Sequence, residues 1–129
     1  MKKFLFVFFV ILMLSGCSAT PPKITYRQIS MDDAVIMMSE ETGYILLDVR
    51  TAEEFAEKHI PGAICIPNES IGSDEIPELP DKSQLIMVYC RSGNRSKQAA
   101  QKLADLGYVN IVEFGGIIDW NGETVSGNS

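Results

Sequence analysis

A cysteine closely followed by two arginines and a glycine is the part of this sequence best suited to chemistry. Cys90 ends an apolar run, and Arg91, Gly93 and Arg95 occupy three of the next five positions. A thiol between a buried strand and a helix faces free backbone N–H groups and the positive end of the helix dipole. Because two guanidinium groups add permanent positive charge, this setting favours the thiolate. We therefore predict that Cys90 is a nucleophile.

An inert, buried thiol is the alternative for any free cysteine, since most of them pack as small hydrophobic residues. Arg91 and Arg95 argue against such an environment for Cys90, because guanidinium groups do not enter apolar cores unpaired. Cys65 lies between Ile64 and Ile66 in an apolar run and fits the inert description better. A redox role that pairs Cys65 with Cys90 stays open, because two cysteines in an oxidising compartment commonly form a disulfide.

Strand-like and helix-like segments alternate along the chain. We predict strands within residues 24–30, 44–50, 60–67, 84–90 and 108–116, and helices within 30–41, 51–59 and 96–107. Ser30 and Thr51 are candidate helix caps, and residues 68–83 are predicted to form a surface loop. This alternation predicts an α/β domain over residues 24–129, with a small parallel sheet flanked by helices on both faces.

The carboxyl ends of parallel strands share one edge of a sheet, where ligands of such folds bind. Asp48 and Cys90 both end predicted strands that are followed by helices. We therefore expect both side chains at this edge.

The first 16 residues have the pattern of a secretion signal. Lys2 and Lys3 precede eleven apolar residues, too few for the roughly 20 of a membrane-spanning helix. The following Leu14-Ser15-Gly16-Cys17 resembles the lipobox of bacterial lipoproteins, in which the cysteine is lipidated after cleavage. The resemblance implies that residues 17–23, with their proline pair, tether an extracytoplasmic domain to a bacterial membrane.

The charge balance argues against nucleic acid as a partner. The whole chain has a formal net charge of −6, and removing residues 1–16 leaves nine basic side chains against 17 acidic ones. A polyanion would be repelled by this surface.

Four motifs together resemble a rhodanese-like domain, in the order that this family uses them. They are "LLDVRTAEEF" at 46–55, "HIPGAICIP" at 59–67, "CRSGNRS" at 90–96 and "GGIIDW" at 115–120. The resemblance implies a thiosulfate or persulfide sulfurtransferase, in which the cysteine holds a transferred sulfur as a persulfide. It implies a small anionic sulfur donor and a thiol acceptor, and neither a metal nor an organic cofactor.

The resemblance also assigns roles around the nucleophile Cys90. The backbone N–H groups expected to hold the transferred sulfur belong to Arg91, Ser92, Gly93, Asn94, Arg95 and Ser96. Arg95, and to a lesser extent Arg91, is expected to attract the anionic donor. Asp48 is expected to support the loop, and Arg50 to pair with Glu53 or Glu54.

The spacing of Cys90 and Arg95 distinguishes two related chemistries. Six-residue C-x4-R loops resemble those of rhodaneses, whereas related phosphatases and arsenate reductases use seven residues, usually with a histidine before the cysteine. Here the loop has six residues and Tyr89 precedes the cysteine. The one histidine, His59, is interpreted as a turn or capping residue, because an ionised thiol needs no base. A non-catalytic binding module is a further alternative, which the intact Cys90 and Arg95 disfavour.

Overall fold

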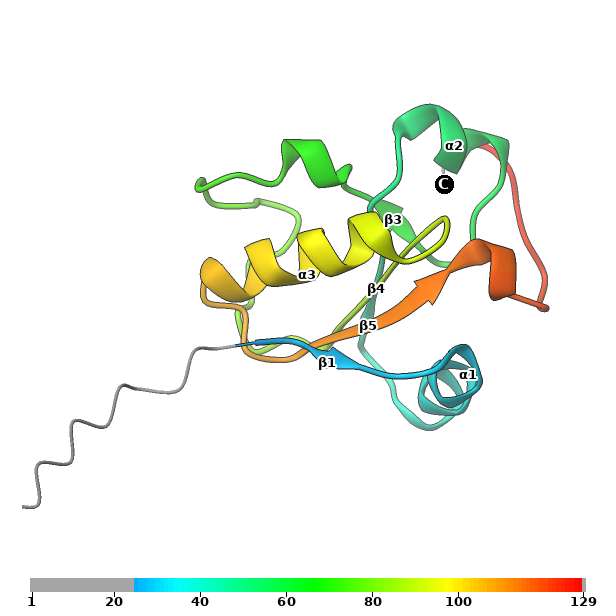
Figure 1. The fold of residues 1–129 in the computed structure, drawn as a ribbon, viewed down its shortest axis with the longest axis horizontal. Helices are drawn as coiled ribbons and strands as arrows, with labels where there is room; N and C mark the ends of the chain where they lie inside the picture. The colour runs from blue at the N-terminus through cyan, green and yellow to red at the C-terminus, as the bar shows by residue number, and fades with distance from the viewer. Residues whose placement is uncertain (1–24, 129) are drawn as a thin grey trace, which may run out of the picture.

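The computed structural model describes residues 25–128 and is built on a five-stranded parallel sheet (Figure 1). The strands are β1 (Arg27–Gln28), β2 (Ile45–Asp48), β3 (Ile64–Cys65), β4 (Ile86–Cys90) and β5 (Ile111–Gly116). Their order in the sheet is β1-β5-β4-β2-β3, and all four pairings are parallel. The central strand β4 therefore carries Cys90 to the middle of the carboxyl edge.

Three α-helices connect the strands and begin close to the predicted positions. They are α1 (Met31–Glu40), α2 (Ala52–Glu57) and α3 (Asn94–Asp105). The Ser30 hydroxyl accepts a hydrogen bond from the Asp33 N–H at 3.1 Å, and Thr51 caps α2 through the Glu54 N–H at 3.2 Å. Both predicted caps are confirmed, because each satisfies a backbone donor that the first helical turn leaves free.

Alternating side chains of the sheet build two apolar clusters, one on each face. Toward α3, residues such as Val88 and Ile111 pack with Leu103. Toward α1 and α2, residues such as Met87 and Phe114 pack in a separate cluster. Figure 1 shows α3 running alongside β4 and β5, with α1 and α2 set apart from it. The predicted α/β fold with helices on both faces is confirmed.

Two local predictions need correction. The apolar run at 60–67 predicts a strand, but β3 has only two residues, lies at the edge of the sheet and leaves Ile64 37% exposed. The segment 68–83 is more than a surface loop. It contains the short 3-10 helix η1 (Asn68–Ser70), and its apolar side chains Ile71, Ile76 and Leu79 are buried in the cluster beneath α3. Their irregular spacing gives no periodic signal, although burial removes each of them from water.

The N-terminal predictions fall on residues that the structure does not describe. The signal at 1–16, the tether at 17–23 and Cys17 all lie outside residues 25–128. Within the described residues, every helix is too short or too polar to cross a bilayer.

Candidate functional site

The Cys90 thiol lies at the end of β4, directly before the N-terminus of α3. The residue is buried, with 1% of its surface exposed, and its Sγ accepts a hydrogen bond from the Gly93 N–H at 3.0 Å. Gly93 caps α3 with φ +113°, a conformation that side chains other than glycine rarely adopt. The sulfur therefore faces a backbone donor and the positive end of a 12-residue helix, the setting in which a negative charge is stabilised.

Strand β5 holds the cysteine loop in place. Cys90 pairs with Gly116, and a register irregularity in β4 precedes this pair. A Cβ placed on Gly116 would stand 1.9 Å from the Arg91 carbonyl oxygen, so the loop backbone crosses directly over this glycine. The Arg91 carbonyl also accepts a hydrogen bond from the Ile118 N–H at 3.2 Å, at the 3-10 helix η2 (Ile117–Asp119). Gly116 thus permits the close contact that holds the cysteine loop on the sheet.

Arg95 and Glu54 form an ion pair that joins the loop to α2. The two guanidinium nitrogens lie 2.7 and 3.0 Å from the two carboxylate oxygens, which is a bidentate geometry. The hydrogen bond from Arg95 lowers the pKa of Glu54 to about 2, and the same contact raises the pKa of Arg95. Arg95 was expected to meet an anionic donor directly, yet a carboxylate already occupies its hydrogen-bonding edge.

The expected partner of Arg50 also needs correction. Arg50 was expected to pair with Glu53 or Glu54, but it forms its ion pair with Asp48. Arg50 Nη2 lies 2.7 Å from Asp48 Oδ2. Both residues are buried, at 0% and 3% exposure. The two residues lie two positions apart at the end of β2, and each balances the other's charge in the interior.

The buried pair supports the site indirectly, through α2. Burial disfavours the charge on Arg50, but the hydrogen bond and charge of Asp48 outweigh this effect and raise the pKa of the guanidinium. Arg50 Nη2 also donates to the Lys58 carbonyl at 2.7 Å, at the end of α2. Because α2 carries Glu54, Asp48 and Arg50 fix the helix that in turn binds Arg95.

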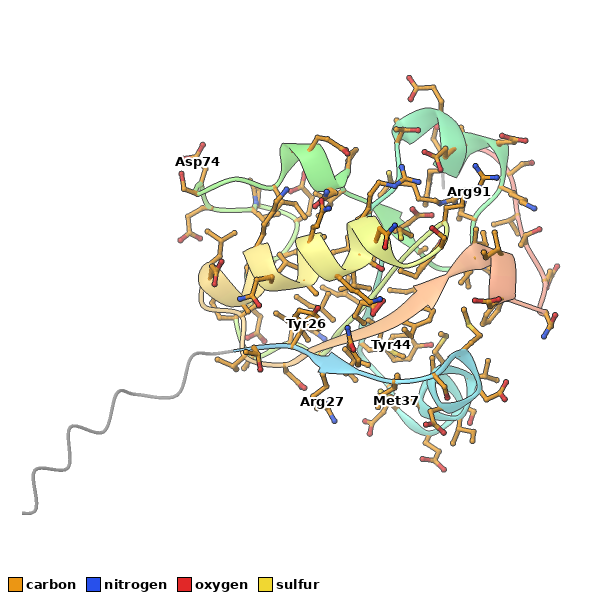
Figure 2. All side chains as sticks on the ribbon, in the orientation of Figure 1. Tyr26, Arg27, Met37, Tyr44, Asp74 and Arg91 are labelled. Carbon is orange, nitrogen blue, oxygen red and sulfur yellow. The ribbon has the colours of Figure 1, made fainter. Side chains whose placement is uncertain are left out.

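An open pocket of about 380 Å³ lies beside the loop. Figure 2 places Arg91 between α2 and η2, where it lines this pocket. The Arg91 side chain is exposed, and among the described residues no carboxylate pairs with it. Of the other loop residues, Ser92 and Asn94 are exposed, whereas the Ser96 hydroxyl lies 3.3 Å from Cys90 Sγ. The free guanidinium near the cysteine is therefore that of Arg91.

His59 lies within the interior, as part of the support for α2. Its Nδ1 donates to the Phe55 carbonyl at 2.8 Å, and its ring stacks on that of Phe55 with 3.7 Å between centroids. Its backbone also pairs with Val125. This contact caps the last turn of α2 and agrees with the interpretation of His59 as a capping residue.

Cys65 has a different environment from Cys90. It packs with the cluster on the α1 and α2 face, whereas Cys90 belongs to the α3 face, and strand β2 lies between their strands. Both thiols are free. Burial, followed by the charge of Asp48, raises the pKa of Cys65 to about 11, so its neutral thiol is favoured. These features favour the inert interpretation of Cys65.

Glu113 is a residue of the site that the sequence analysis missed. It lies in β5 on the α3 face with 2% exposure, and its Oε1 accepts hydrogen bonds from Ser96 Oγ and the Gly115 N–H, at 3.1 and 3.0 Å. An acid inside the apolar run "NIVEFGG" was the available signal, because a carboxylate is rarely buried without partners.

Within residues 25–128, no group of three acidic, histidine or cysteine side chains is arranged as metal ligands would be.

Comparison with known proteins identifies two family models along the chain. Residues 31–123 match the rhodanese-like domain, and residues 1–18 match the prokaryotic membrane lipoprotein lipid attachment site. The first match covers more than half of the chain, so the chain belongs to the rhodanese-like family. The second indicates a lipid-anchored membrane protein.

Relatives and a solved structure agree with this family. The chain is 36% identical to the thiosulfate sulfurtransferase PspE of Escherichia coli over 73 residues, 57% of this chain and 70% of that protein. It is 32% identical over 102 residues to the adenylyltransferase and sulfurtransferase uba4 of Ogataea parapolymorpha, covering 77% of this chain but only 26% of that longer protein. A structure described as rhodanese with anions from E. coli superposes with a TM-score of 0.60 at 33% identity, covering 65% of this chain and 99% of the other.

Proposed function

We propose that this protein is a sulfurtransferase that carries a sulfane sulfur on Cys90, between an anionic donor such as thiosulfate and a thiol acceptor. The observation that carries the proposal is the position of Cys90 Sγ, which accepts the Gly93 N–H at the N-terminus of α3. Such a position stabilises a thiolate and then the sulfur bound to it. Relatives named as sulfurtransferases support this assignment.

The proposed reaction has two displacement steps. The Cys90 thiolate attacks the outer sulfur of thiosulfate, a new S–S bond forms, and sulfite leaves with the electron pair of the broken S–S bond. An acceptor thiolate then attacks the outer sulfur of the persulfide and releases the Cys90 thiolate. The N–H groups of the 91–96 loop are proposed to hold the transferred sulfur. A six-residue loop suits one sulfur atom better than a tetrahedral oxyanion.

Arg91 is proposed as the main attraction for the anionic donor. It is exposed at the pocket beside the loop, whereas Arg95 is held by Glu54. A guanidinium without a carboxylate partner offers all its donors to an incoming anion. We therefore assign donor attraction to Arg91, and to Arg95 the role of fixing the loop against α2.

A proposal for the location of the protein rests on its N-terminal residues. We propose that residues 1–16 are removed, that Cys17 is lipidated, that residues 17–23 act as a tether and that residues 24–129 form the domain outside the cytoplasm. The match to a lipid attachment site supports this arrangement.

Mass spectrometry of the protein after incubation with thiosulfate alone tests the proposal. We expect a gain of one sulfur atom on the Cys90 peptide, and its removal by cyanide or a thiol. Cys90→Ser is expected to abolish the gain, whereas Cys65→Ser retains it. Arg91→Ala is expected to weaken loading by thiosulfate more than loading by an uncharged persulfide donor.

The same experiment distinguishes the competing functions. If oxidation joins Cys65 to Cys90 and Cys65→Ser abolishes turnover, the protein is a thiol redox protein. If no donor loads sulfur on Cys90, the proposal fails in favour of a binding module.

A further inference from the structure

The Ser96 hydroxyl lies near more hydrogen-bond acceptors than its single proton can satisfy. Its Oγ lies 3.3 Å from Cys90 Sγ, 3.1 Å from Glu113 Oε1, 2.9 Å from the Gly93 carbonyl and 3.4 Å from that of Gly115. The hydroxyl has one proton to donate, so it satisfies one of these acceptors at a time. While the Cys90 thiol is neutral, its S–H donates to Ser96 Oγ, and the Ser96 hydroxyl donates to Glu113 or to a carbonyl.

Ionisation of Cys90 changes the demands on this hydroxyl. A thiolate attracts the Ser96 proton, after which Ser96 Oγ and Glu113 Oε1 would face each other at 3.1 Å without a proton between them. Thiolate and carboxylate would then be two buried negative charges joined through one side chain, because Cys90 and Glu113 are 1% and 2% exposed. Two like charges in such a site disfavour each other strongly. A proton on Glu113 removes both problems.

We propose that Glu113 is a positioning residue that receives the Cys90 proton through Ser96, so that the site carries one negative charge shared between sulfur and carboxylate. The inference rests on the proposed role of Cys90 as the nucleophile. The Cys90 proton moves to Ser96 Oγ as the Ser96 proton moves to Glu113 Oε1. The products are a thiolate, a hydroxyl that donates to it and a neutral carboxylic acid. Because no proton leaves the site, its total charge does not change.

The geometry of β5 fits this role. The Gly115 N–H donates to Glu113 Oε1 at 3.0 Å and holds the carboxyl group in place beside Ser96. On the sulfur side, the Gly93 N–H and the N-terminus of α3 favour the charge once it has moved to Cys90. The two ends of the chain of hydrogen bonds are thus each supported by a backbone donor.

Other charged groups near the site do not take the place of Glu113 as acceptor of the Cys90 proton. In β1 and β4 the neighbours of Glu113 in the sheet are the uncharged Gln28 and Val88. The charged side chains of the helices and loop that lie nearest the cysteine loop include Arg95 and Lys97 of α3, Glu54 of α2 and Arg91. None of them is a histidine, the side chain that ordinarily changes charge between pH 5 and 8. His59 packs against Phe55, which belongs to the opposite face of the sheet.

The pH dependence of Cys90 alkylation by iodoacetamide tests the inference. The full chain is alkylated in detergent, and peptide mass spectrometry quantifies Cys90 separately from the other two cysteines. In the wild type, we expect a rate constant that changes by less than about two-fold between pH 5 and 7, because the proton only moves within the site. A wild-type rate that follows a single ionisation across this range overturns the inference.

Glu113→Gln removes the proton acceptor and keeps nearly the same shape. The wild-type rate constant is expected to rise a second time at a pH above the plateau, when the shared proton leaves the site, whereas Glu113→Gln is expected to reach its full rate in a single step. Glu78→Gln is the matched control, because it makes the same change on an exposed residue and is expected to leave the profile unaltered. If Glu113→Gln keeps the two steps of the wild type, the inference is wrong.

Ser96→Ala provides a second test if Glu113→Gln does not fold. Without the hydroxyl, the charge stays on Glu113, and the alkylation rate between pH 5 and 7 is expected to fall at least about ten-fold. An unchanged rate in this variant overturns the inference. Thiosulfate loading is measured in parallel. A plateau without loading refutes the proposed function alone, whereas loading without a plateau refutes this inference alone.

Discussion

Replacement of Glu54 by glutamine tests the ion pair that joins the cysteine loop to α2. The pKa of Glu54 falls from 4.5 to about 2, chiefly through its hydrogen bond to Arg95. A shift of this size sets an upper limit of roughly 3 kcal/mol on its contribution to the free energy of unfolding. The side chains of Arg95 and Glu54 retain 27% and 31% exposure, so solvent screens the pair. We therefore expect Glu54→Gln to lower the free energy of unfolding at pH 7 by about 1–2 kcal/mol.

The stabilisation by Glu54 is also expected to depend on pH. Because the pKa of Glu54 is lower in the folded protein, the stabilisation is complete above about pH 5 and is lost as the pH falls from 4.5 toward 2. Urea titrations of residues 24–129 at pH 7 and pH 3 should show a difference between wild type and variant that shrinks to half or less at the lower pH.

Glu53→Gln is the matched control for the Glu54 experiment. Glu53 lies in the same first turn of α2 and is exposed, so both variants change the interaction with the helix dipole in a similar way. We expect a loss below about 0.5 kcal/mol for Glu53→Gln. Equal losses for the two variants, or a Glu54 effect that does not change with pH, would refute the reasoning.

Three further predictions concern other parts of the chain. Cys65 is expected to react with iodoacetamide at pH 7 far more slowly than an exposed cysteine, because burial raises its pKa to about 11; rapid labelling would contradict this. Gly116→Ala is expected to abolish sulfur loading, since its Cβ would meet the Arg91 carbonyl at 1.9 Å, whereas Gly72→Ala, with no atom within 4 Å, retains it. Cys17→Ala is expected to abolish fatty-acid labelling and membrane retention, and unchanged fractionation would count against the lipid anchor.

The features predicted correctly from the sequence are those encoded by neighbouring residues. The caps Ser30 and Thr51 each act on an N–H three residues later, so the two partners lie within one short segment. The order of strands and helices also follows from local periodicity. The loop between β4 and α3 was predicted for the same reason, because its glycine and arginines are adjacent to Cys90.

The missed features depend on residues that are distant in the sequence. Arg95 binds Glu54, 41 positions away, and Ser96 binds Glu113, 17 positions away. Nothing in the segment around Arg95 indicates which carboxylate will lie opposite it once the strands have assembled. Arg50 shows a related limit, since three acids lie within four positions of it and only the folded strand end selects Asp48.

The parallel direction of β1 separates the point where the chain enters the sheet from the thiol of Cys90. The chain enters the sheet at the amino end of β1, whereas Cys90 lies at the carboxyl end of the parallel strand β4, so the two points lie at opposite edges of the sheet. If a lipid on Cys17 holds the N-terminal side at the bilayer, the thiol is directed away from it. Acceptors dissolved in the aqueous compartment then reach the thiol directly, while an acceptor embedded in the lipid requires the whole domain to turn over.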